Sequence, residues 1–416
     1  MNSLTIEQAR NIGEQIVKQE VFSVVLTGGE PFLNRKALYL LTDYLAKNNI
    51  DTAINSNLTK IKEDDVKKLK QKGILGILTS LCSYDEDKHD KITRNKGSFK
   101  QALKGIEIVQ KHNMPLAVNM VVTKHNVDSV YKTGLFVGKE LGIKAFNATP
   151  MNACSAAGDF HLDLTLSEED YISTLKSLVA LEKNHNMITD ILEPVPHCLI
   201  LHDYDLEKFL KRTCCAGVST LAIGADSSVR PCTHSDQDYG NLQEKSMAEI
   251  WSSMEDWKNG NYLPKECEPC SVDILCRGAC RTEALAYTGS LNGINPLYKE
   301  PLQLTKEKKV REGLDNKNLK FKQDIRYRKE DNNTFILYSP RDKFLEVSPE
   351  EIKYLSLLKS KYPSFTLEEM LSKETTTSKQ REKLESFLSD LYHSEFIYSP
   401  EKHREKGKIS EVKENG

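Results

Sequence analysis

The stretch FSVVLTGGEPFL, residues 22–33, decides the fold. Its first six residues are mostly apolar and rich in β-branched side chains, which predicts a buried strand of a parallel sheet. Gly28 and Gly29 follow at once, and glycines there let the backbone approach a ligand closely. Glu30 adds a carboxylate that can hold an amine or a hydroxyl. An ordinary glycine turn is the alternative, but the strand before it, and Pro31 and a helix after it, favour a binding turn.

The alternation of strand and helix continues beyond this turn. Short apolar runs recur, separated by amphipathic helical stretches, at Asp51–Asn55, Ile74–Ser80, Leu116–Thr123 and Ile143–Thr149. Repeated βα units predict an α/β fold with an open parallel sheet or part of a βα barrel. The chain starts with a helix, so the first strand of the series is absent and a missing N-terminal piece is expected.

Composition excludes several classes of protein. A length of 416 residues suggests two or three domains, and a net charge of −2 gives no bulk attraction to nucleic acid or to a membrane surface. No apolar run approaches the roughly 20 residues of a membrane helix, and the N-terminus is not a signal peptide. We therefore expect a cytoplasmic protein with reduced thiols, in which clustered cysteines serve metal binding or catalysis.

One segment of the chain holds seven of the ten cysteines. Four of them follow the pattern Cys-x2-Cys-x5-Cys-x3-Cys, and four thiolates are the ligand set of a cubane or of structural zinc. The second pair does not repeat the Cys-x2-Cys spacing, and seven cysteines exceed the need of one zinc ion. One or two iron–sulfur clusters are therefore favoured over zinc. The seven are Cys214, Cys215, Cys232, Cys267, Cys270, Cys276 and Cys280.

The C-terminal part reads as a separate small module. Thr334–Tyr338 and Lys343–Val347 predict a hairpin. Ser348 opens a capping box with proline at the first helical position, and Thr366 opens a second one. A third amphipathic helix and a short last strand near Phe396 complete a small winged-helix-like α+β unit.

Taken together, these motifs resemble the radical S-adenosylmethionine (SAM) enzymes, in the branch with a C-terminal SPASM domain. LTGGEPFL, residues 26–33, looks like the family's glycine motif. SLCSYDEDKHDKI and KGSF, within residues 80–99, look like its fourth-strand pattern. CCAGVSTLAIGADSSVRPC, GNLQEKSMAEIW and CEPCSVDILCRGAC, within residues 214–280, follow the order of a SPASM domain. Several motifs in order over about residues 1–300 argue against chance.

The resemblance implies a domain plan. Residues 1–160 are expected to form a partial (β/α)6 radical SAM barrel that lacks its first strand. Residues 161–300 would hold connecting helices and the SPASM auxiliary iron–sulfur domain. A charged linker over 301–320 would lead to the small C-terminal domain over 321–400, and the polar tail 401–416 is expected to be disordered.

The same resemblance implies a cofactor site. In the family the glycine motif holds the methionyl amine of SAM, and a serine on the following pattern lies near the cofactor. A polar turn and an asparagine on neighbouring strands complete the match, and no residue is singled out as catalytic. The expected SAM-binding residues are Gly28, Gly29, Glu30, Pro31, Asn55, Ser80 and Asn119.

The resemblance also implies two auxiliary [4Fe–4S] clusters. One would use Cys215, Cys232 and Cys280, with Cys214 or Cys198 as the possible fourth ligand. The other would use the three remaining cysteines of the segment, Cys267, Cys270 and Cys276.

This chain departs from the family in three places. The Cys-x3-Cys-x2-Cys loop that holds the catalytic cluster is absent together with the strand before it, and a truncated chain is the simplest explanation. Ser227 replaces the glycine that usually stands five residues before Cys232. Tyr298 stands where the family has its last cysteine, which leaves Tyr298, water, substrate or nothing as fourth ligand of the second cluster.

The implied activity is radical maturation of a ribosomally synthesised peptide, forming a thioether, a carbon–carbon crosslink or a related oxidation. In the family, reduced [4Fe–4S] cleaves SAM to a 5′-deoxyadenosyl radical, which abstracts a substrate hydrogen. The expected partners are a precursor peptide with a leader sequence and an electron donor of the flavodoxin or ferredoxin type.

The C-terminal unit looks like a PqqD-like RiPP recognition element, whose strand edge pairs with a leader peptide. A generic winged-helix domain is the alternative for this unit. Three alternatives remain for the whole chain. They are an anaerobic sulfatase-maturase-like enzyme, a truncated or degenerate non-catalytic peptide-binding protein and an iron–sulfur electron-transfer partner.

Overall fold

The computed structural model describes residues 3–153, 161–302, 317–330, 334–339 and 343–400. It divides into two compact units, Met1–Leu304 and Thr305–Gly416. The expected tail over 401–416 and most of the expected linker over 301–320 lie outside the described residues.

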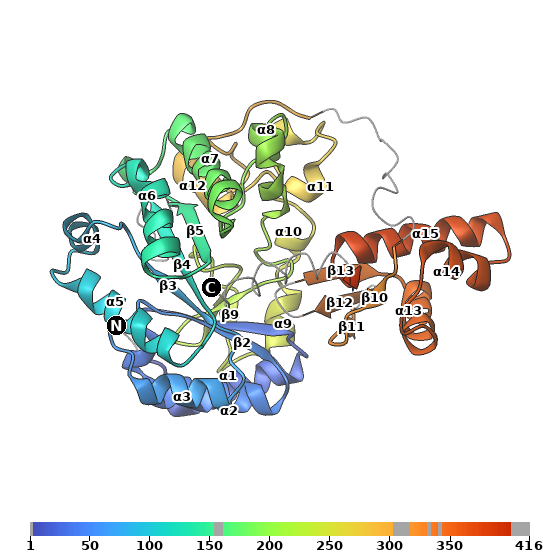
Figure 1. Ribbon diagram of the computed structural model, residues 1–416, viewed down its shortest axis with the longest axis horizontal. Coiled ribbons are helices and arrows are strands. Elements are labelled where there is room, and N and C mark those ends of the chain that lie inside the picture. The colour runs from blue at the N-terminus through green and yellow to red at the C-terminus, as the bar shows by residue number, and fades with distance from the viewer. Residues whose placement is uncertain (1–2, 154–160, 303–316, 331–333, 340–342, 401–416) are drawn as a thin grey trace, which may run out of the picture. The chain divides into compact units, whose positions relative to one another are not determined.

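A six-stranded parallel sheet forms the centre of the first unit (Figure 1). Its strands follow one another in chain order, and each pairs with the next in parallel. This is the α/β sheet that the apolar runs predicted. The strands are β1 (Ser23–Leu26), β2 (Asp51–Asn55), β3 (Ile77–Ser80), β4 (Leu116–Val122), β5 (Ala145–Pro150) and β6 (Ile188–Asp190).

Helices connect these strands, as expected for βα units. The first, α1, begins at the capping box of Thr5 and Gln8, in which each side chain bonds the other residue's backbone N–H. The helices are α1 (Ile6–Lys18), α2 (Arg35–Lys47), α3 (Glu63–Gln71), α4 (Glu86–Thr93), α5 (Ser98–Lys111), α6 (Val130–Leu135) with its continuation Phe136–Glu140, and α7 (Glu168–His185).

The two faces of the sheet differ in chemistry because side chains alternate along a strand. One face carries Val118, Met120, Val122 and Phe146, all fully buried in a core shared with α3, α5 and α7. The opposite face, called here the polar face, carries Asn119, Asn147 and Thr149, and Val121 on it is 40% exposed. The first face packs into the hydrophobic core of the unit, and the polar face is available for a ligand.

The cysteine-rich part of the first unit packs against its N-terminal helices. Ile12 and Leu41, from α1 and α2, share one core with Val229 and Ile250. The Asn11 amide also donates to the Leu242 carbonyl at 2.8 Å. The elements here are α8 (His197–Ile200), the 3-10 helix η5 (Tyr204–Lys211), β7 (Ala222–Ile223), β8 (Ser228–Arg230), β9 (Gly240–Asn241), α9 (Met247–Ser252), α10 (Glu255–Lys258), α11 (Asp273–Cys276) and α12 (Arg281–Thr288).

The second unit has a three-stranded antiparallel sheet and three helices around their own core. The predicted hairpin and both capped helices are confirmed, and the Ser348 capping box forms as expected. The elements are β10 (Lys320–Phe321), β11 (Arg326–Lys329), β12 (Phe335–Ser339), β13 (Lys343–Val347), α13 (Pro349–Lys361), α14 (Leu367–Glu374), α15 (Ser378–His393) and β14 (Ile397–Tyr398).

Six strands in the described part of the chain, β6 to β11, were not predicted from the sequence. β6 lies in a stretch expected to be mostly helical, and with three residues it is too short to form a recognisable apolar run. β11 has the sequence RYRK, and its three charged residues predicted a solvent-exposed linker instead of a strand. β10 pairs with β14, and Leu319 beside it is fully buried, so the second unit begins before residue 321. Among the described residues, no helix is long and apolar enough to cross a membrane.

Candidate cofactor and iron–sulfur site

The glycine turn follows directly on β1 and has the backbone that its sequence predicts. Gly28 has a φ of +131°, a conformation that side-chain-bearing residues rarely adopt. A Cβ at this position would meet no atom within 4 Å, so the glycine is required by the backbone and leaves open space beside it. Pro31 then starts the 3-10 turn Pro31–Leu33, where a missing N–H is tolerated.

The Glu30 carboxylate holds this turn against the end of β2. Its Oε1 accepts the backbone N–H of Phe32 at 3.1 Å and the Ser56 hydroxyl at 2.8 Å. Its Oε2 accepts the backbone N–H of Asn57 at 3.0 Å. The carboxylate that the sequence assigned to an amine or hydroxyl of a ligand is thus bonded to groups of the protein. It shapes the turn that would meet the cofactor.

The other predicted cofactor residues lie on the polar face of the sheet. Ser80 is paired in register with Asn119, which is paired with Asn147 on β5. Asn55 ends β2 and is in register with Leu78, two residues before Ser80, so it shares the same face. The structure therefore brings Asn55, Ser80 and Asn119 to one face of the sheet.

Two further polar residues on this face were missed in the sequence. The Thr149 hydroxyl donates to Asn119 Oδ1 at 2.8 Å and accepts the backbone N–H of Leu192 at 3.2 Å. Asn147 lies beside Asn119 in register. The run AFNATP was read as apolar, although its alternation of Asn147 and Thr149 with buried residues was a signal of a polar inner face.

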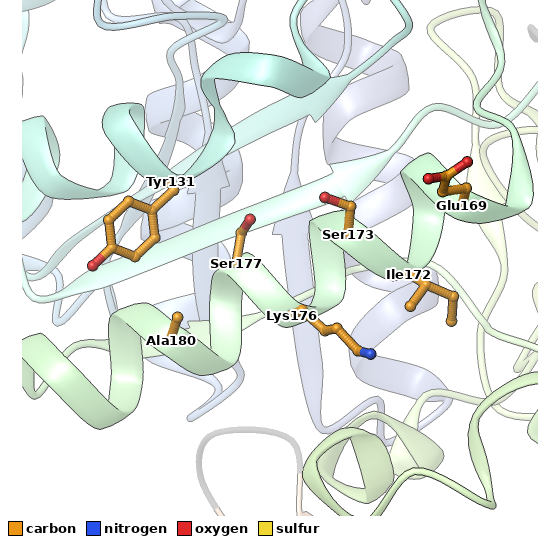
Figure 2. A pocket seen from close by; sticks show the side chains of 7 residues that line it. All are labelled: Tyr131, Glu169, Ile172, Ser173, Lys176, Ser177 and Ala180. Carbon is orange, nitrogen blue, oxygen red and sulfur yellow. The ribbon is translucent and has the colours of Figure 1, made fainter.

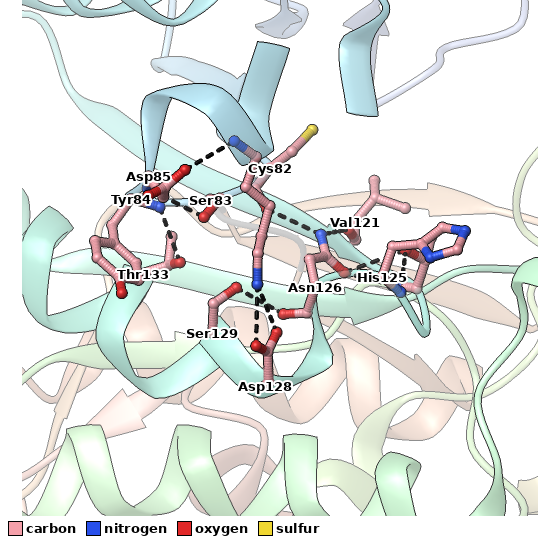
Figure 3. A network of polar contacts seen from close by, with 12 residues as sticks. Cys82, Ser83, Tyr84, Asp85, Val121, His125, Asn126, Asp128, Ser129 and Thr133 are labelled. Carbon is pink, nitrogen blue, oxygen red and sulfur yellow. Dashed lines mark hydrogen bonds and ion pairs between the residues drawn. The ribbon is translucent and has the colours of Figure 1, made fainter. Parts of the chain in front are cut away.

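The loop after β3 is fixed by a buried asparagine (Figure 3). Asn126 is fully buried, and its amide nitrogen donates to the carbonyls of Cys82 at 2.9 Å and Val121 at 3.0 Å. Its Oδ1 accepts the backbone N–H of Thr123 at 2.7 Å. The Tyr84 backbone N–H donates to the Thr133 hydroxyl at 3.2 Å. This network sets where the chain leaves Ser80.

Two further motifs, His89-Asp90 and Gly97-Ser98-Phe99, make hydrogen bonds that fix the loop after β3 and the start of α5. Asp90 accepts hydrogen bonds from the Ser98 hydroxyl and from the backbone N–H groups of Gly97 and Phe99, and so caps the start of α5. His89 is buried, and its Nδ1 accepts the backbone N–H of Cys82 at 3.2 Å. Asp90 therefore caps α5, and His89 holds the backbone of Cys82 in place.

The described cysteines are free thiols, and those near the C-terminal end of the first unit form two groups. In the first, called the Cys280 group, Cys214 and Cys232 pack against one apolar cluster with Ala216. Cys280 is buried and accepts the Asn152 amide at 2.9 Å. Burial raises the pKa of Cys280, and Cys214 lies near enough to raise it further. Cys215 is exposed, and its thiol donates to the Thr213 carbonyl at 3.5 Å.

The second group, called the Cys276 group, contains Cys267, Cys270 and Cys276. Cys276 and Cys270 share an apolar cluster with Val272 and Leu302. Burial, followed by the nearby Cys276, raises the pKa of Cys267 to about 11, and Arg281 opposes this shift. A half-buried fourth cysteine, Cys198, packs against the same cluster. Protons held this firmly must leave before the sulfurs can bind iron.

The two groups are joined by a very short turn and share one arginine. Between Cys276 and Cys280 stand Arg277, Gly278 and Ala279, with φ angles of 54°, 68° and 60°. Positive φ is costly for the two that are not glycine. Arg281 is only 3% exposed, and burial lowers its pKa while Cys280, Cys214, Cys267 and Cys276 raise it. Its guanidinium donates to the carbonyls of Leu291 at 3.2 Å and Gly293 at 2.9 Å.

Two half-buried carboxyl groups, Glu193 and Glu283, lie beside the Cys280 group. Burial raises the pKa of Glu193 to about 7, and that of Glu283 also to about 7. After burial, which is the largest cause, both carboxyl groups raise the pKa of Cys280. His234 Nδ1 lies 3.5 Å from Glu193 Oε1, and burial lowers the pKa of this histidine. Glu193, Glu283 and His234 therefore belong to the surroundings of the Cys280 group.

The donor set fits iron–sulfur clusters in chemistry. Each group offers soft sulfur ligands in an apolar setting, with nearby amide N–H groups as donors to sulfur. Among the residues that the structure describes, no three histidine, cysteine, aspartate or glutamate side chains form a group that could hold a single metal ion. A four-iron cluster is bound at its corners, so its ligands need not converge as those of one ion do.

Two hollows of the described surface differ in their lining. One lies beside Tyr131 and is lined by Glu169, Ser173 and Lys176 of α7 (Figure 2). The other, a cavity of about 220 Å³, is lined by Cys214 and Arg281. Of these two, the second adjoins the candidate site.

Comparison with protein families identifies two domains. A model of the radical SAM superfamily matches residues 1–137, and a model of the iron–sulfur cluster-binding SPASM domain matches residues 214–271. The first match contains the glycine turn and the polar-face residues Asn55, Ser80 and Asn119. The second contains Cys214, Cys215, Cys232, Cys267 and Cys270.

Two proteins of known name are similar in sequence to this chain. The AdoMet-dependent haem synthase of Methanosarcina barkeri is 24% identical over 304 residues, 69% of this chain and 84% of that protein. The antilisterial bacteriocin subtilosin biosynthesis protein AlbA of Bacillus subtilis is 26% identical over 258 residues, 61% of this chain and 54% of AlbA.

Solved structures share the fold. Native anSMEcpe with bound AdoMet has a TM-score of 0.54 at 20% identity, covering 70% of this chain and 84% of that one. Streptococcus suis SuiB bound to precursor peptide SuiA has a TM-score of 0.57 at 15% identity, covering 70% and 68%. SAM and iron–sulfur clusters are the cofactors of the two matched domains. The chain therefore carries a domain of the radical SAM superfamily, whose members are enzymes, and a SPASM iron–sulfur cluster-binding domain.

Proposed function

We propose that this enzyme matures a ribosomally synthesised peptide, forming a thioether, a carbon–carbon crosslink or a related oxidation. The observation that carries the proposal is the second unit, whose antiparallel sheet has β11 and β13 as its outer strands. An outer strand can take up an extended peptide by strand addition. A recognition unit of this kind, in one chain with radical SAM and SPASM domains, suits a long and flexible substrate.

The names of relatives support a peptide substrate. AlbA is a bacteriocin biosynthesis protein, and SuiB has been solved with its precursor peptide. By analogy the partners are a precursor peptide with a leader sequence and an electron donor of the flavodoxin or ferredoxin type.

The residues of this chain have separable roles in that activity. Bound SAM, together with a catalytic iron–sulfur cluster whose Cys-x3-Cys-x2-Cys ligands this sequence does not contain, would supply the radical that abstracts a hydrogen atom. Gly28 and Gly29 open the backbone to SAM, and Glu30 fixes the turn that carries them. Asn119, held by Thr149, lines the polar face on which the cofactor would lie. The cysteine groups hold the auxiliary clusters.

Of the two outer strands, β13 is the better edge for a leader peptide. β11 carries Arg326, Arg328 and Lys329, and charged side chains protect an edge against pairing. β13 has two charged residues, Lys343 and Glu346, and leaves 46% of the Phe344 side chain exposed as an apolar anchor. An incoming strand beside β13 would cover this ring.

One observation favours a second candidate. The AdoMet-dependent haem synthases of Methanosarcina barkeri and Oleidesulfovibrio alaskensis match this chain over 84% and 74% of their own lengths, whereas AlbA matches over 54% of its length. A porphyrin substrate would need no strand edge, so the second unit would then be dispensable for substrate binding.

A matched pair of variants tests the peptide proposal. Phe344 on β13 and Tyr327 on β11 are both exposed, and each contacts an aromatic ring of β12. The ring centroids of Phe344 and Tyr338 lie 5.2 Å apart, and those of Tyr327 and Phe335 lie 6.0 Å apart. The probe is a fluorescein-labelled precursor peptide encoded beside the gene, bound by the full chain and followed by polarisation. Phe344→Thr should weaken binding about tenfold, roughly 1.4 kcal/mol, and Tyr327→Thr should leave it unchanged.

The controls separate the two candidates. Removing residues 305–416, the whole second unit, should abolish peptide binding while the iron content stays the same. Unchanged affinity in both Phe344→Thr and the deletion would reject the recognition role. Haem formation from a porphyrin substrate, with no change in the peptide, would establish the second candidate instead.

A further inference from the structure

Cys198 lies outside the cysteine-rich segment in sequence but inside it in space. It belongs to α8, before the residues that match the SPASM domain. Its side chain nevertheless packs against the apolar cluster of Val272, Cys276 and Leu302, together with Cys270. The fold has therefore brought a fourth thiol to the Cys276 group.

Backbone amides tie this thiol to the same group. The N–H of Lys299 donates to Cys198 Sγ at 3.4 Å, and the N–H of Leu302 donates to Cys270 Sγ at 3.4 Å. The N–H of His197, one residue before Cys198, donates to Cys276 Sγ at 3.4 Å. Amide donors to sulfur are the contacts that stabilise cluster thiolates and tune their potential.

The chain around Tyr298 gives a second indication of closeness. The Tyr298 hydroxyl lies 3.4 Å from the carbonyl of Glu266, the residue before Cys267. The next residue, Lys299, is the one whose N–H donates to Cys198. Tyr298 therefore lies in the same neighbourhood as these thiols.

We propose that Cys198 is the fourth ligand of the iron–sulfur cluster held by Cys267, Cys270 and Cys276. Each thiol loses its proton to solvent on binding iron. The assignment replaces both sequence-based alternatives, in which Cys198 served the other cluster and this cluster lacked a fourth cysteine. It concerns ligation alone and holds whichever substrate the enzyme takes.

Two neighbours are rival ligands. Tyr298 stands at the family's last cysteine, but its hydroxyl donates to the Glu266 carbonyl at 3.4 Å. His197 is 5% exposed, and its Nε2 has no hydrogen-bond partner in the described part of the chain. Both are tested beside Cys198.

The experiment uses the full chain, reconstituted with iron and sulfide without oxygen. Iron, acid-labile sulfide and the EPR spectrum of the reduced protein are measured for each variant. Cys198→Ser should lose about half of the roughly 8 irons of two clusters, as should Cys267→Ser. Cys82→Ser, at a half-buried cysteine of the same unit, should keep them all, as should Tyr298→Phe and His197→Gln.

A rescue separates ligation from a structural role. Adding Tyr298→Cys to Cys198→Ser places a thiol in the same neighbourhood and should restore iron content and the EPR signal. Packing alone would not be repaired by a cysteine at position 298. Full iron and an unchanged spectrum in Cys198→Ser would overturn the proposal, as would iron loss in Tyr298→Phe or His197→Gln alone. If circular dichroism shows Cys198→Ser to be unfolded, failure of the double variant to recover iron overturns it too.

Discussion

The Ser56 hydroxyl donates a hydrogen bond to the Glu30 carboxylate at 2.8 Å, joining the glycine turn after β1 to the end of β2. Asn57 and Phe32 add their backbone N–H groups to the same carboxylate. Three donors on one carboxylate leave it little freedom. The glycine turn is therefore shaped before any ligand arrives.

Replacing Glu30 by glutamine should destabilise the turn by about 1–3 kcal/mol. The new amide nitrogen cannot accept a hydrogen bond, so one of the backbone donors loses its partner. Thermal unfolding of the full chain measures the loss. Glu14→Gln, at an exposed position of α1, is the control and should leave the midpoint unchanged.

Alanine at Gly28 should reduce SAM binding through the backbone. A φ of +131° costs about 1–3 kcal/mol for a residue with a side chain, although no neighbour would be struck. Gly240→Ala is the matched control, because Gly240 has a φ of +133° and the nearest atom to its added Cβ would lie at 3.4 Å, an ordinary contact. Both variants should lose comparable stability, but only Gly28→Ala should retain less radiolabelled SAM. Equal retention would count against a role for the turn.

Asp65 should give the first unit a stability that depends on pH. Burial opposes its ionisation, but hydrogen bonds from Arg35 and Tyr39 outweigh it, and the pKa of Asp65 lies below its usual value. A lowered carboxyl pKa stabilises the fold above the unfolded pKa of about 3.9, and the gain is lost as pH falls through the folded pKa. Asp65→Asn should cost about 2 kcal/mol at pH 7 in urea unfolding, and progressively less as the pH falls below about 4 and through the lowered pKa of Asp65. Asp64→Asn, whose side chain is 83% exposed, should cost almost nothing at either pH.

Arg281 should set the potential of both auxiliary clusters. Its positive charge lies near thiols of both groups, and positive charge favours the reduced, more negative cluster. Arg281→Gln should lower the midpoint potentials by about 50 mV, roughly tenfold in a one-electron equilibrium. Redox titration followed by EPR measures this shift. Arg10→Gln removes an exposed arginine and should leave both potentials in place; the same shift in both variants would show a nonspecific charge effect.

Local patterns predicted the core of the first unit well. Apolar runs marked β1 to β5 because strands buried on one face by helices must be apolar at alternate positions. The glycine motif predicted its own conformation, since the positive φ of Gly28 follows from a residue type with a special backbone. Such features depend on neighbours in sequence and can be read directly.

Contacts between distant segments were beyond the reach of these patterns. Nothing in the run AFNATP shows that Thr149 will donate to Asn119 on the next strand. Cys198 is separated from the cysteine-rich segment in sequence, and only packing of α8 against Val272 and Leu302 brings it to the Cys276 group. β6 escaped because three residues carry no periodicity.

The turn from Arg277 to Ala279 has a consequence for how the protein matures in the cell. Its run of positive φ angles is strained at two of three positions and persists only where both ends are held in place. Cys276 and Cys280 are those ends, one in each thiol group. We therefore expect this turn to order last, after iron has been inserted on both sides. In protein that has not received its clusters, it should be the first place that a protease cuts.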